Sequence, residues 1–453
     1  MTTIALDRTD EISTGRRDVV SRVRQLAADE PDQVFCQFLT GRSSQPITYS
    51  ELLDAANRSA AAYLDYGVRP GDVVLIILRH GPHLFSSFLG ALLIGALPSF
   101  LPFLTGKQQP ELYWTVHRAL FTRIGARLWV TWGDNLASMR QSMPDLCTPV
   151  HLVEDTPRDG RTPRLPGRAF SGPAFLQHSS GTTGLKKGVV IAHEALIAQV
   201  NAYAEAIDLT RKDTIATWLP VYHDMGLIAC FLMPLMRGVP IVAMDPFEWV
   251  TRPTMLLDAI EKYRCSLAWM PNFAFHHLCG LAPEGRIWDL ACVRALINCS
   301  EPCKPDTFRQ FAERFGSMGV GLEKLQTCYA LAENVFCATQ SSFGQAVPVW
   351  HAENSAPFLS CGAPIGGVQV RIVDADRRPV PKGTSARSRS QEPVFLTGTI
   401  GIQRPPARPC PPAGTALAIS ASGATARFTC QGEWTISSSY MALITTPTIS
   451  SSL

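Results

Sequence analysis

The stretch "HSSGTTGLKKG", from His178 to Gly188, gathers small hydroxyl and glycine residues and ends in two lysines. Glycines let the backbone turn tightly and expose its N–H groups, and the hydroxyl side chains add further hydrogen-bond donors. Lysines at the end of such a loop supply positive charge for a polyphosphate. The loop is not a Walker A loop, because Lys187 is followed by Gly188 instead of serine or threonine. A polar surface turn is the alternative interpretation.

The segments before this loop indicate a βαβ unit in a large core. "VVLIIL" (Val73–Leu78) is typical of a buried strand, and the apolar run from Leu84 to Leu104 follows it. That run is long enough to suggest a membrane span. Pro98 and Pro102 interrupt its second half, so a buried helix followed by a second strand is the better interpretation.

The segments after the loop continue the alternation of helix and strand. "VVIAHEAL" (Val189–Leu196) is strand-like and favours a loop held at the edge of a sheet. Two stretches predict amphipathic helices, "TMLLDAIEKY" (Thr254–Tyr263) and "PDTFRQFAERFG" (Pro305–Gly316). Their expected buried faces consist of Leu256, Ile260 and Tyr263 in the first and Phe308, Phe311, Ala312 and Phe315 in the second. This alternation predicts an α/β fold with mainly parallel sheets.

Composition narrows the class of protein. The chain has 453 residues, 46% hydrophobic and 17% charged, which predicts two or three compact units. A net charge of +3 gives no support for binding to nucleic acid or to a membrane surface. Thirteen cysteines without a C-x-x-C pair favour free thiols in a reducing cytosol. The N-terminus shows no signal peptide, so we expect a cytoplasmic protein.

Two further stretches accompany the loop. "WLPVYHDMGL" (Trp218–Leu227) places His223 and Asp224 among apolar residues, and "CYALAENVF" (Cys328–Phe336) places Tyr329 four residues before Glu333. Together with the loop they resemble three successive motifs of the adenylate-forming (AMP-binding) superfamily, which includes acyl-CoA synthetases and fatty acyl-AMP ligases. The loop is similar to the family's [TS]SG[TS]TGxPKG pattern from Ser179 to Gly188, except that Lys186 stands where proline is usual.

Two weaker similarities extend the resemblance. "NCSEP" (Asn298–Pro302) looks like the family's adenine-side segment, and Leu359–Gly383 looks like the glycine-rich turn and strand pair that follow. The five motifs occur in family order over about residues 30 to 384. "WLPVYHDMGLIA", "PNFAF" (Pro271–Phe275) and Ala332 look most like the fatty acyl-AMP ligase and long-chain acyl-CoA ligase branch. The stretch Asn334–Phe358 is short for the insertion of fatty acyl-AMP ligases.

The resemblance implies the large N-terminal domain of the adenylate-forming fold. It would comprise two α/β subdomains with parallel-type sheets and an incomplete β-barrel, with the mobile C-terminal domain absent. We expect the first subdomain over residues 1–170 and the second, with the ATP motifs and the start of the barrel, over residues 171–384. Residues 385–453 are then an aberrant, disordered tail.

The implied reaction is ATP-dependent activation of a carboxylic acid, with a fatty acid as the expected substrate. Attack by the carboxylate on the α-phosphorus gives an acyl-adenylate and pyrophosphate, which makes AMP the leaving group. Catalysis requires a triphosphate held in line and neutralised by Mg²⁺. The implied cofactors are therefore ATP and Mg²⁺. Coenzyme A or an acyl carrier protein would be the acceptor in a second step.

The resemblance also assigns site residues. Thr182, Thr183 and Lys187 would hold the β- and γ-phosphates, Glu333 would ligate Mg²⁺, and His223 would lie at the carboxylate end of the acyl pocket. Lys187, His223 and Glu333 are thus the expected catalytic residues. The expected nucleotide-binding residues are Ser179, Ser180, Gly181, Thr182, Thr183, Gly184, Lys187, Ser300, Glu301, Pro302, Tyr329 and Ala330.

Each assignment has a structural alternative. Glu333 can be a carboxylate in the first turn of a helix, stabilised by the helix dipole without a metal. Tyr329 and Trp218, taken singly, can be core aromatic residues. His223 has the same status outside its motif.

The chain departs from the family after Thr384. The tail contains no lysine and no aspartate and is rich in serine, proline and alanine. The family should show here a Thr-Gly-Asp motif for the ribose, a Gly-Arg hinge and a catalytic lysine, and none is present. The alternative function is therefore a catalytically inactive truncated product that retains weak nucleotide binding.

The genetic code suggests a cause for this departure. If each true codon combines the third base of one codon with the first two bases of the next, residues 428–442 permit "YVSGRMDDLIIVYG", which resembles the family's hinge. The same shift permits "WYRTGDLGF" across residues 413–422 and "GEIAV" across residues 385–390. We therefore predict a frameshift near the codon of Thr384. A low-complexity tail is the alternative.

Overall fold

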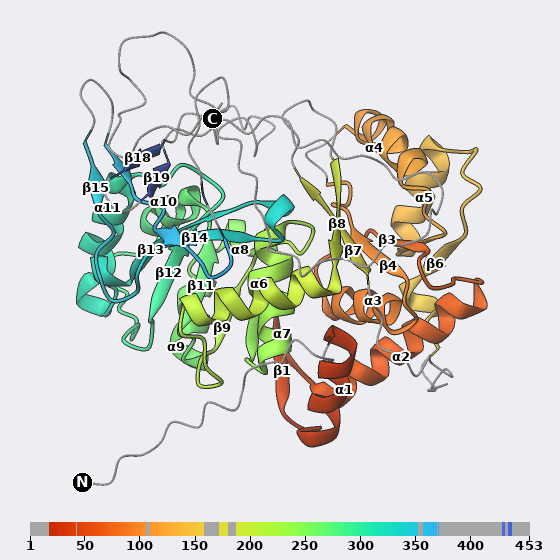
Figure 1. The fold of residues 1–453 in the computed structure, drawn as a ribbon, viewed down its shortest axis with the longest axis horizontal. Coiled ribbons are helices and arrows are strands. Elements are labelled where there is room, and N and C mark those ends of the chain that lie inside the picture. The colour runs from red at the N-terminus through yellow and green to blue at the C-terminus, as the bar shows by residue number, and fades with distance from the viewer. Residues whose placement is uncertain are drawn as a thin grey trace. The chain divides into compact units, whose positions relative to one another are not determined.

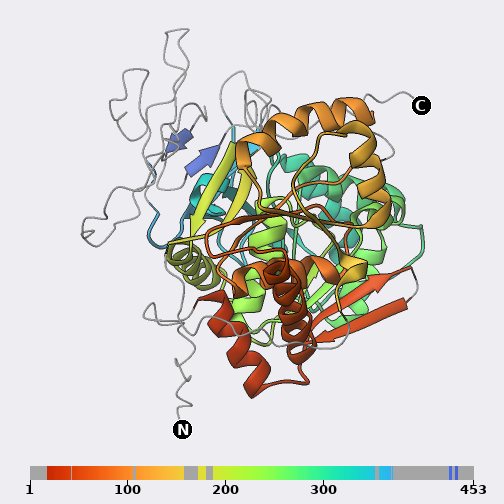
Figure 2. The same ribbon diagram turned by 90° about the vertical axis from the view of Figure 1, so that its right-hand side faces the viewer.

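The computed structural model describes residues 18–41, 43–105, 109–157, 172–179, 187–351, 357–368, 370, 428–430 and 434–436 (Figures 1 and 2). The chain divides into two compact units, and each is described separately. The first unit consists of Met1–Trp269, Leu281–Val293 and Leu331–Phe336. The second consists of Met270–Gly280, Arg294–Ala330 and Cys337–Leu453.

The first unit contains a six-stranded sheet with the order β6-β5-β3-β4-β7-β8 (Figure 1). Its strands are β3 (Val73–Ile76), β4 (Leu97–Phe100), β5 (Leu128–Thr131), β6 (Val150–Leu152), β7 (Pro173–Ser179) and β8 (Lys187–Ala192). Strands β6, β5, β3, β4 and β7 run parallel, and β8 runs antiparallel to β7 at the edge. The predicted βαβ unit is confirmed, since α3 (Pro82–Leu93) connects the parallel neighbours β3 and β4.

Two further helices accompany this sheet, α4 (Pro110–Ile124) and α5 (Gly133–Ser142). Helix α3 is buried along most of its length, which explains why its sequence is apolar on every side. It packs against α2 (Tyr49–Asp65), where the hydroxyl of Tyr63 donates to the carbonyl of Ser87. Among the described residues, no helix combines the length and the apolar character needed to cross a bilayer.

The first unit also contains consecutive strands in the order β11-β9-β10-β1-β2. They are β1 (Val34–Thr40), β2 (Ser43–Thr48), β9 (Ile215–Thr217), β10 (Ile241–Met244) and β11 (Leu267–Met270). Strands β11, β9, β10 and β1 are parallel, and β2 is antiparallel to β1. The helices of this part are α1 (Val19–Asp29), α6 (His193–Ala206), α7 (Met233–Arg237), α8 (Pro246–Thr251) and α9 (Met255–Tyr263).

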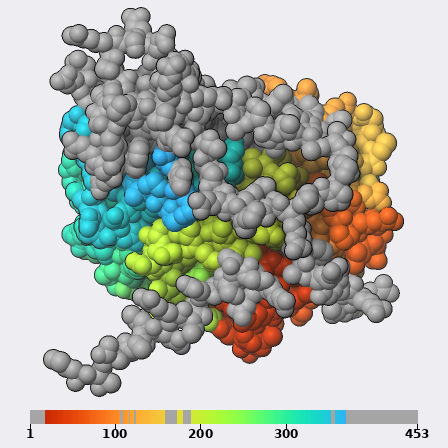
Figure 3. All heavy atoms as spheres, in the orientation of Figure 1, coloured from red at the N-terminus to blue at the C-terminus, as the bar shows by residue number. Residues whose placement is uncertain are grey.

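Helix α6 begins inside a stretch that the sequence predicts as strand. Strand β8 ends at Ala192, and His193 to Leu196 form the first turn of α6 instead of continuing the strand. Part of α6 lies at the surface in the space-filling view, where its atoms are yellow-green (Figure 3). The expected position of the loop at a sheet edge is confirmed, since β8 is the last strand of its sheet.

In the second unit the strand order is β17-β14-β13-β12. These strands are β12 (Ala295–Asn298), β13 (Leu325–Ala330), β14 (Cys337–Gln340) and β17 (Ala363–Pro364). Strands β12 and β13 are parallel, whereas β14 is antiparallel to both β13 and β17. Two short antiparallel pairs join β15 (Val349–Trp350) with β16 (Phe358–Leu359) and β18 (Phe428–Cys430) with β19 (Trp434–Ile436). The helices are α10 (Asn272–Leu281) and α11 (Pro305–Phe315).

Both predicted amphipathic helices are present. Helix α9 buries Leu256 and Ile260, and α11 buries Phe308, Phe311 and Phe315. The α/β class with parallel-type sheets is confirmed. The subdomain boundary after residue 170 stays a prediction. Two strands from before this boundary pair with strands from after it: β4 pairs with β7, and β1 pairs with β10. Apart from β18 and β19, the expected tail over residues 385–453 lies outside the described residues.

Candidate functional site

Strands β7 and β8 hold the two ends of the predicted phosphate loop. Ser179 and Lys187 face each other in the antiparallel register, so the loop leaves and re-enters the sheet at one place on its edge. His178, next to the loop, is buried, and its Nε2 lies 2.8 Å from Oγ of Ser99 on β4. The sheet therefore fixes both ends of the loop. Ser180, Gly181, Thr182, Thr183 and Gly184 lie outside the described residues, and their roles stay predictions.

The second motif, Trp218–Leu227, follows β9 and leads into a π-helical segment, η2 (Met225–Leu232). Trp218 is buried and stacks on Trp249 of α8, with ring centroids 3.7 Å apart and planes inclined by 1°. Gly226 is needed because a Cβ at this position would lie 2.3 Å from the carbonyl oxygen of Pro220. This close approach folds η2 against the preceding turn. π-Helical segments are uncommon and are enriched at functional sites.

His223 lies on that turn with its side chain exposed. Its backbone N–H donates to the carbonyl of Pro220 at 3.2 Å, and its carbonyl accepts from the N–H of Leu227 at 2.9 Å. The imidazole neighbours the ring of Tyr222, with centroids 4.9 Å apart. The turn thus presents the imidazole to solvent.

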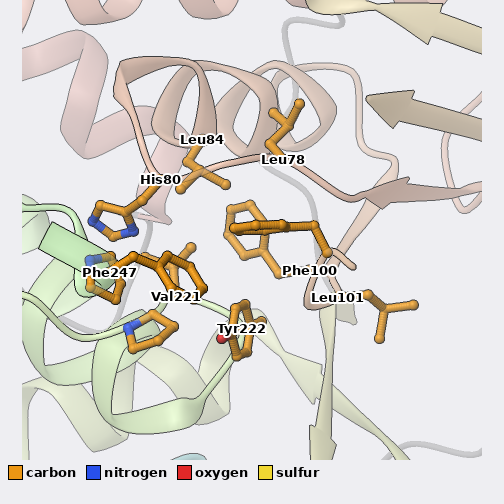
Figure 4. Close-up of a pocket in the computed structure, with 11 residues that line it drawn as sticks. Leu78, His80, Leu84, Phe100, Leu101, Val221, Tyr222 and Phe247 are labelled. Carbon is orange, nitrogen blue, oxygen red and sulfur yellow. The ribbon is translucent and has the colours of Figure 1, made fainter. Parts of the chain in front are cut away.

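An apolar pocket lies beside the same turn (Figure 4). Its lining combines the ends of β3 and β4 with the second motif and the start of α8, namely Leu78, His80, Leu84, Phe100, Leu101, Phe103, Pro220, Val221, Tyr222, Pro246 and Phe247. Burial, with a smaller contribution from Asp245, raises the pKa of Tyr222 to about 12, so its hydroxyl stays neutral. The pocket offers an apolar surface that begins one residue before His223.

Asp224 supplies the carboxyl group of this turn, and its pKa is raised. Its Oδ1 accepts the N–H of Met225 at 2.8 Å, which caps the start of η2. Burial raises the pKa of Asp224 to about 6, the hydrogen bond from Met225 opposes that shift, and the negative charge of Glu333 adds to it. Asp224 and Glu333 are therefore electrostatically coupled within the first unit.

Glu333 belongs to a three-residue 3-10 turn, η5 (Ala332–Asn334), and its side chain is exposed. The residues on either side of it, Ala332 and Asn334, are buried. The alternative prediction, a carboxylate in the first turn of a helix, also stays open, because Glu333 lies in the first turn of this 3-10 helix. The buried neighbours hold the turn in place, and the exposed carboxylate is accessible to a metal ion.

The donor chemistry of this region fits Mg²⁺. No group of three or more His, Cys, Asp or Glu side chains converges in a metal-binding arrangement among the residues that the structure describes. Mg²⁺ is commonly bound through one or two carboxylates, with substrate phosphates and water as its remaining ligands. An exposed Glu333 coupled to Asp224 matches binding through one or two carboxylates. It does not match a cage built entirely from protein ligands.

The second unit holds the remaining predicted residues. Tyr329 and Ala330 end β13, and both are half-buried. Ser300 adopts a left-handed backbone (φ 69°) just after β12. Glu301 accepts the N–H of Phe273 at the start of α10, at 2.8 Å, and burial raises the pKa of its carboxyl. The amide of Asn298 donates to that of Asn272 at 2.9 Å.

These contacts give Glu301 a structural role that the sequence did not reveal. It ties the segment after β12 to the first turn of α10, so Ser300 to Pro302 are held from one side by the backbone of Phe273. Whether the same residues contact a nucleotide stays a prediction. Tyr329 and Glu333, four residues apart in the chain, fall into different units.

Sequence reasoning missed Gln177, and it named Asp224 in the second motif without giving it a role. Gln177 lies on β7 with its side chain buried, and it contacts the turn that carries Glu333. A glutamine inside an apolar strand, two residues before a glycine-rich loop, was the available signal. The signal for Asp224 was its place between His223 and an apolar run.

The chain is similar to several fatty-acid ligases. It is 26% identical over 360 residues to the medium-chain-fatty-acid–[acyl-carrier-protein] ligase JamA of Moorena producens, covering 72% of this chain and 60% of JamA. It is 30% identical over 342 residues to the long-chain-fatty-acid–AMP ligase FadD32 of Mycolicibacterium smegmatis, covering 71% of this chain and 53% of FadD32. The chain thus spans less than two thirds of the length of these relatives.

The fold agrees with these similarities. The crystal structure of the fatty acid AMP ligase from Legionella pneumophila superposes with a TM-score of 0.72 and 25% identity, covering 83% of this chain and 68% of that protein. The AMP-binding enzyme family matches residues 23–386, which include the loop, the His223 turn and the Glu333 turn. This chain belongs to the AMP-binding enzyme family.

Proposed function

We propose that this chain activates a fatty acid with ATP, forming an acyl-adenylate and releasing pyrophosphate. The observation that carries the proposal is the family match over residues 23–386, combined with an exposed His223 and an exposed Glu333 in the unit that also anchors the loop. One carboxylate oxygen of the acid attacks the α-phosphorus, and the bond to pyrophosphate breaks.

Each group has a distinct task in this proposal. The hydroxyls of Thr182 and Thr183 and the ammonium of Lys187 hold the β- and γ-phosphates, which keeps the leaving group in line. Glu333 holds Mg²⁺, which when bound neutralises phosphate charge. His223 contacts the carboxylate of the acid. Tyr329, Ala330 and the segment from Ser300 to Pro302 contact the adenine.

The proposed substrate class rests on the relatives named above, which act on medium-chain and long-chain fatty acids. The pocket beside Tyr222 has a mostly apolar lining (Figure 4), but its free volume of about 10 Å³ has room for about one water molecule and not for an acyl chain. An acyl carrier protein or coenzyme A is the proposed acceptor of a second step, and the cytoplasm the proposed location.

A pyrophosphate-release assay tests the proposal. The purified chain is incubated with ATP, Mg²⁺ and saturated fatty acids of short, medium and long chain. We expect release that depends on the fatty acid. ATP binding without any release would favour the alternative, an inactive product that retains weak nucleotide binding. Absence of both would contradict the proposed function.

Lys187 provides the matching test of the loop. Lys187→Ala should weaken ATP binding about tenfold or more, since a charge-assisted phosphate contact is lost, while changing stability little. Lys212→Ala is the control, because Lys212 is an exposed lysine of the same unit on the turn before β9. Equal ATP affinity in the two variants would remove Lys187 from the site.

A further inference from the structure

The turn that carries Glu333 is closed by its own backbone. The N–H of Leu331 donates to the carbonyl of Phe336 at 2.8 Å, and the N–H of Asn334 donates back to the carbonyl of Leu331 at 3.0 Å. The N–H of Phe336 donates to the carbonyl of Asn334 at 2.7 Å. This last bond spans two residues, so Val335 is the central residue of a γ-turn.

Val335 adopts a strained backbone conformation in this turn. Its φ of 66° and ψ of −54° are close to the classical γ-turn, which is rare and strained. A β-branched residue at positive φ is a clear outlier, because its branched side chain crowds the backbone. Strained conformations are unfavourable and persist where neighbouring groups hold them in place.

Gln177 is such a neighbour. Its Nε2 donates to the carbonyl oxygen of Ala332 at 2.6 Å and to that of Val335 at 2.8 Å. Because both partners are acceptors, the orientation of the amide follows from the contacts themselves. The Gln177 side chain is 4% exposed and reaches the turn from β7. The two bonds lie on either side of Glu333 in the sequence.

We propose that Gln177 is a positioning residue that holds the Glu333 turn against β7, the strand from which the phosphate loop departs two residues later. One side chain then fixes the position of the Glu333 turn relative to the end of β7. This inference rests on the proposed function. The Glu333 carboxylate is exposed, so the backbone of its turn has to supply the fixed position that metal binding needs.

Gln177→Met tests the proposal, because methionine has a similar length and no N–H donor. The measurement is ATP affinity with and without Mg²⁺. We expect the affinity in Mg²⁺ to fall about tenfold or more, as for other groups that orient metal ligands, with the metal-free affinity unchanged. A purely structural role would lower both affinities or neither. Gln177→Asn, which keeps the amide and shortens its reach, should show the same selective loss.

Gln37→Met is the matched control. Gln37 is a half-buried strand glutamine of the same unit, on β1, and its side chain makes no hydrogen bond among those that the described structure records. It should leave both affinities unchanged. A double-mutant cycle with Glu333→Gln then shows whether Gln177 acts through Glu333. In the Glu333→Gln background, Gln177→Met should cost no further Mg²⁺-dependent affinity, and additive losses would overturn the proposal.

Hydrogen exchange of the ligand-free protein tests the clamp without any activity. We expect slow exchange at the amides of Val335 and Phe336 in the unmodified chain and faster exchange in Gln177→Met. Fast exchange in the unmodified chain would overturn the clamp even if a variant failed to fold. If the unmodified chain binds no ATP in Mg²⁺, the proposed function and the role of Gln177 in it both fail, and exchange decides on the clamp alone.

Discussion

His80 is a titratable side chain placed among apolar groups. Its ring lies near that of Phe38, with centroids 5.7 Å apart, and it lines the pocket beside Tyr222 (Figure 4). Its Nε2 is buried and has no hydrogen-bond partner among the described residues. Burial lowers the pKa of His80 from 6.5 to about 4, because the charged imidazolium loses its hydration. The neutral form is therefore the native one.

This shift makes stability depend on pH with a definite sign. Below pH 6.5 the unfolded chain binds a proton at this position that the folded chain does not bind until about pH 4. Stability contributed by the neutral imidazole is thus present above pH 6.5 and is lost as the pH falls towards 4. His80→Phe should reduce the loss of unfolding free energy between pH 7 and 5 by about 2 kcal/mol.

Denaturant unfolding at the two pH values measures this difference. His351→Phe is the control, since His351 is exposed and lies in the other unit. It should leave the pH dependence as it is in the unmodified chain. An identical pH dependence in His80→Phe and the unmodified chain would show that the imidazole is hydrated in the native state.

At the scale of single residues, the sequence predicted candidate functional residues but not the contacts that hold them. His223 and Glu333 were predicted because their motifs are short and contiguous. Gln177 was missed because its partners, Ala332 and Val335, lie more than 150 residues away in the chain. The γ-turn at Val335 was equally hidden, since a valine carries no local preference for positive φ. Contacts that tertiary packing creates leave no signal in a single sequence.

At the scale of elements, the apolar pattern predicted helices and strands well where packing is one-sided. Helices α9 and α11 bury most of the residues that their periodicity selects, whereas Tyr263 and Ala312 are only half-buried. Strand β8 and helix α6 were merged, because "VVIAHEAL" has no glycine or proline at the junction between them. The π-helical geometry of η2 was not predictable either. It depends on how closely Gly226 approaches Pro220.

Substitution of Gly226 tests how η2 packs. In Gly226→Ala the added Cβ would lie 2.3 Å from a backbone oxygen, so the backbone itself would have to move. We expect a loss of about 2 kcal/mol or more in unfolding free energy, with displacement of the His223 turn. Gly280→Ala in α10 is the control. It meets no atom within 4 Å and should stabilise the helix by about 0.5–1 kcal/mol.

Urea unfolding of the two variants compares the effects directly. If Gly226→Ala were as stable as the unmodified chain, the contact between η2 and the Pro220 turn would be looser than the structure shows. ATP binding is the second measurement. ATP binding should change little in Gly280→Ala, because Gly280 is exposed at the end of α10, away from every predicted site residue in sequence.

At the scale of the whole molecule, the sequence predicted where family resemblance ends. We expected the departure after Thr384, and the family match ends at residue 386. Composition alone cannot separate a low-complexity tail from a shifted reading frame, because both give serine-, proline- and alanine-rich sequence. The codon argument separates them. It requires three family motifs, in order, in one alternative frame.

The last prediction concerns that frame. DNA sequencing across the codon of Thr384 should reveal an alternative frame that encodes "GEIAV", "WYRTGDLGF" and "YVSGRMDDLIIVYG" in this order. A chain expressed in the restored frame regains an aspartate for the ribose and a hinge. It should therefore release pyrophosphate about a hundredfold or more faster than the present chain, as expected when positioned groups are regained. Lys187→Ala in the restored chain should abolish most of that gain, because the regained groups and Lys187 act on the same bound ATP. If neither alternative frame encodes these motifs, the departure after Thr384 belongs to the protein itself, and the inactive-product alternative becomes the better account of its function.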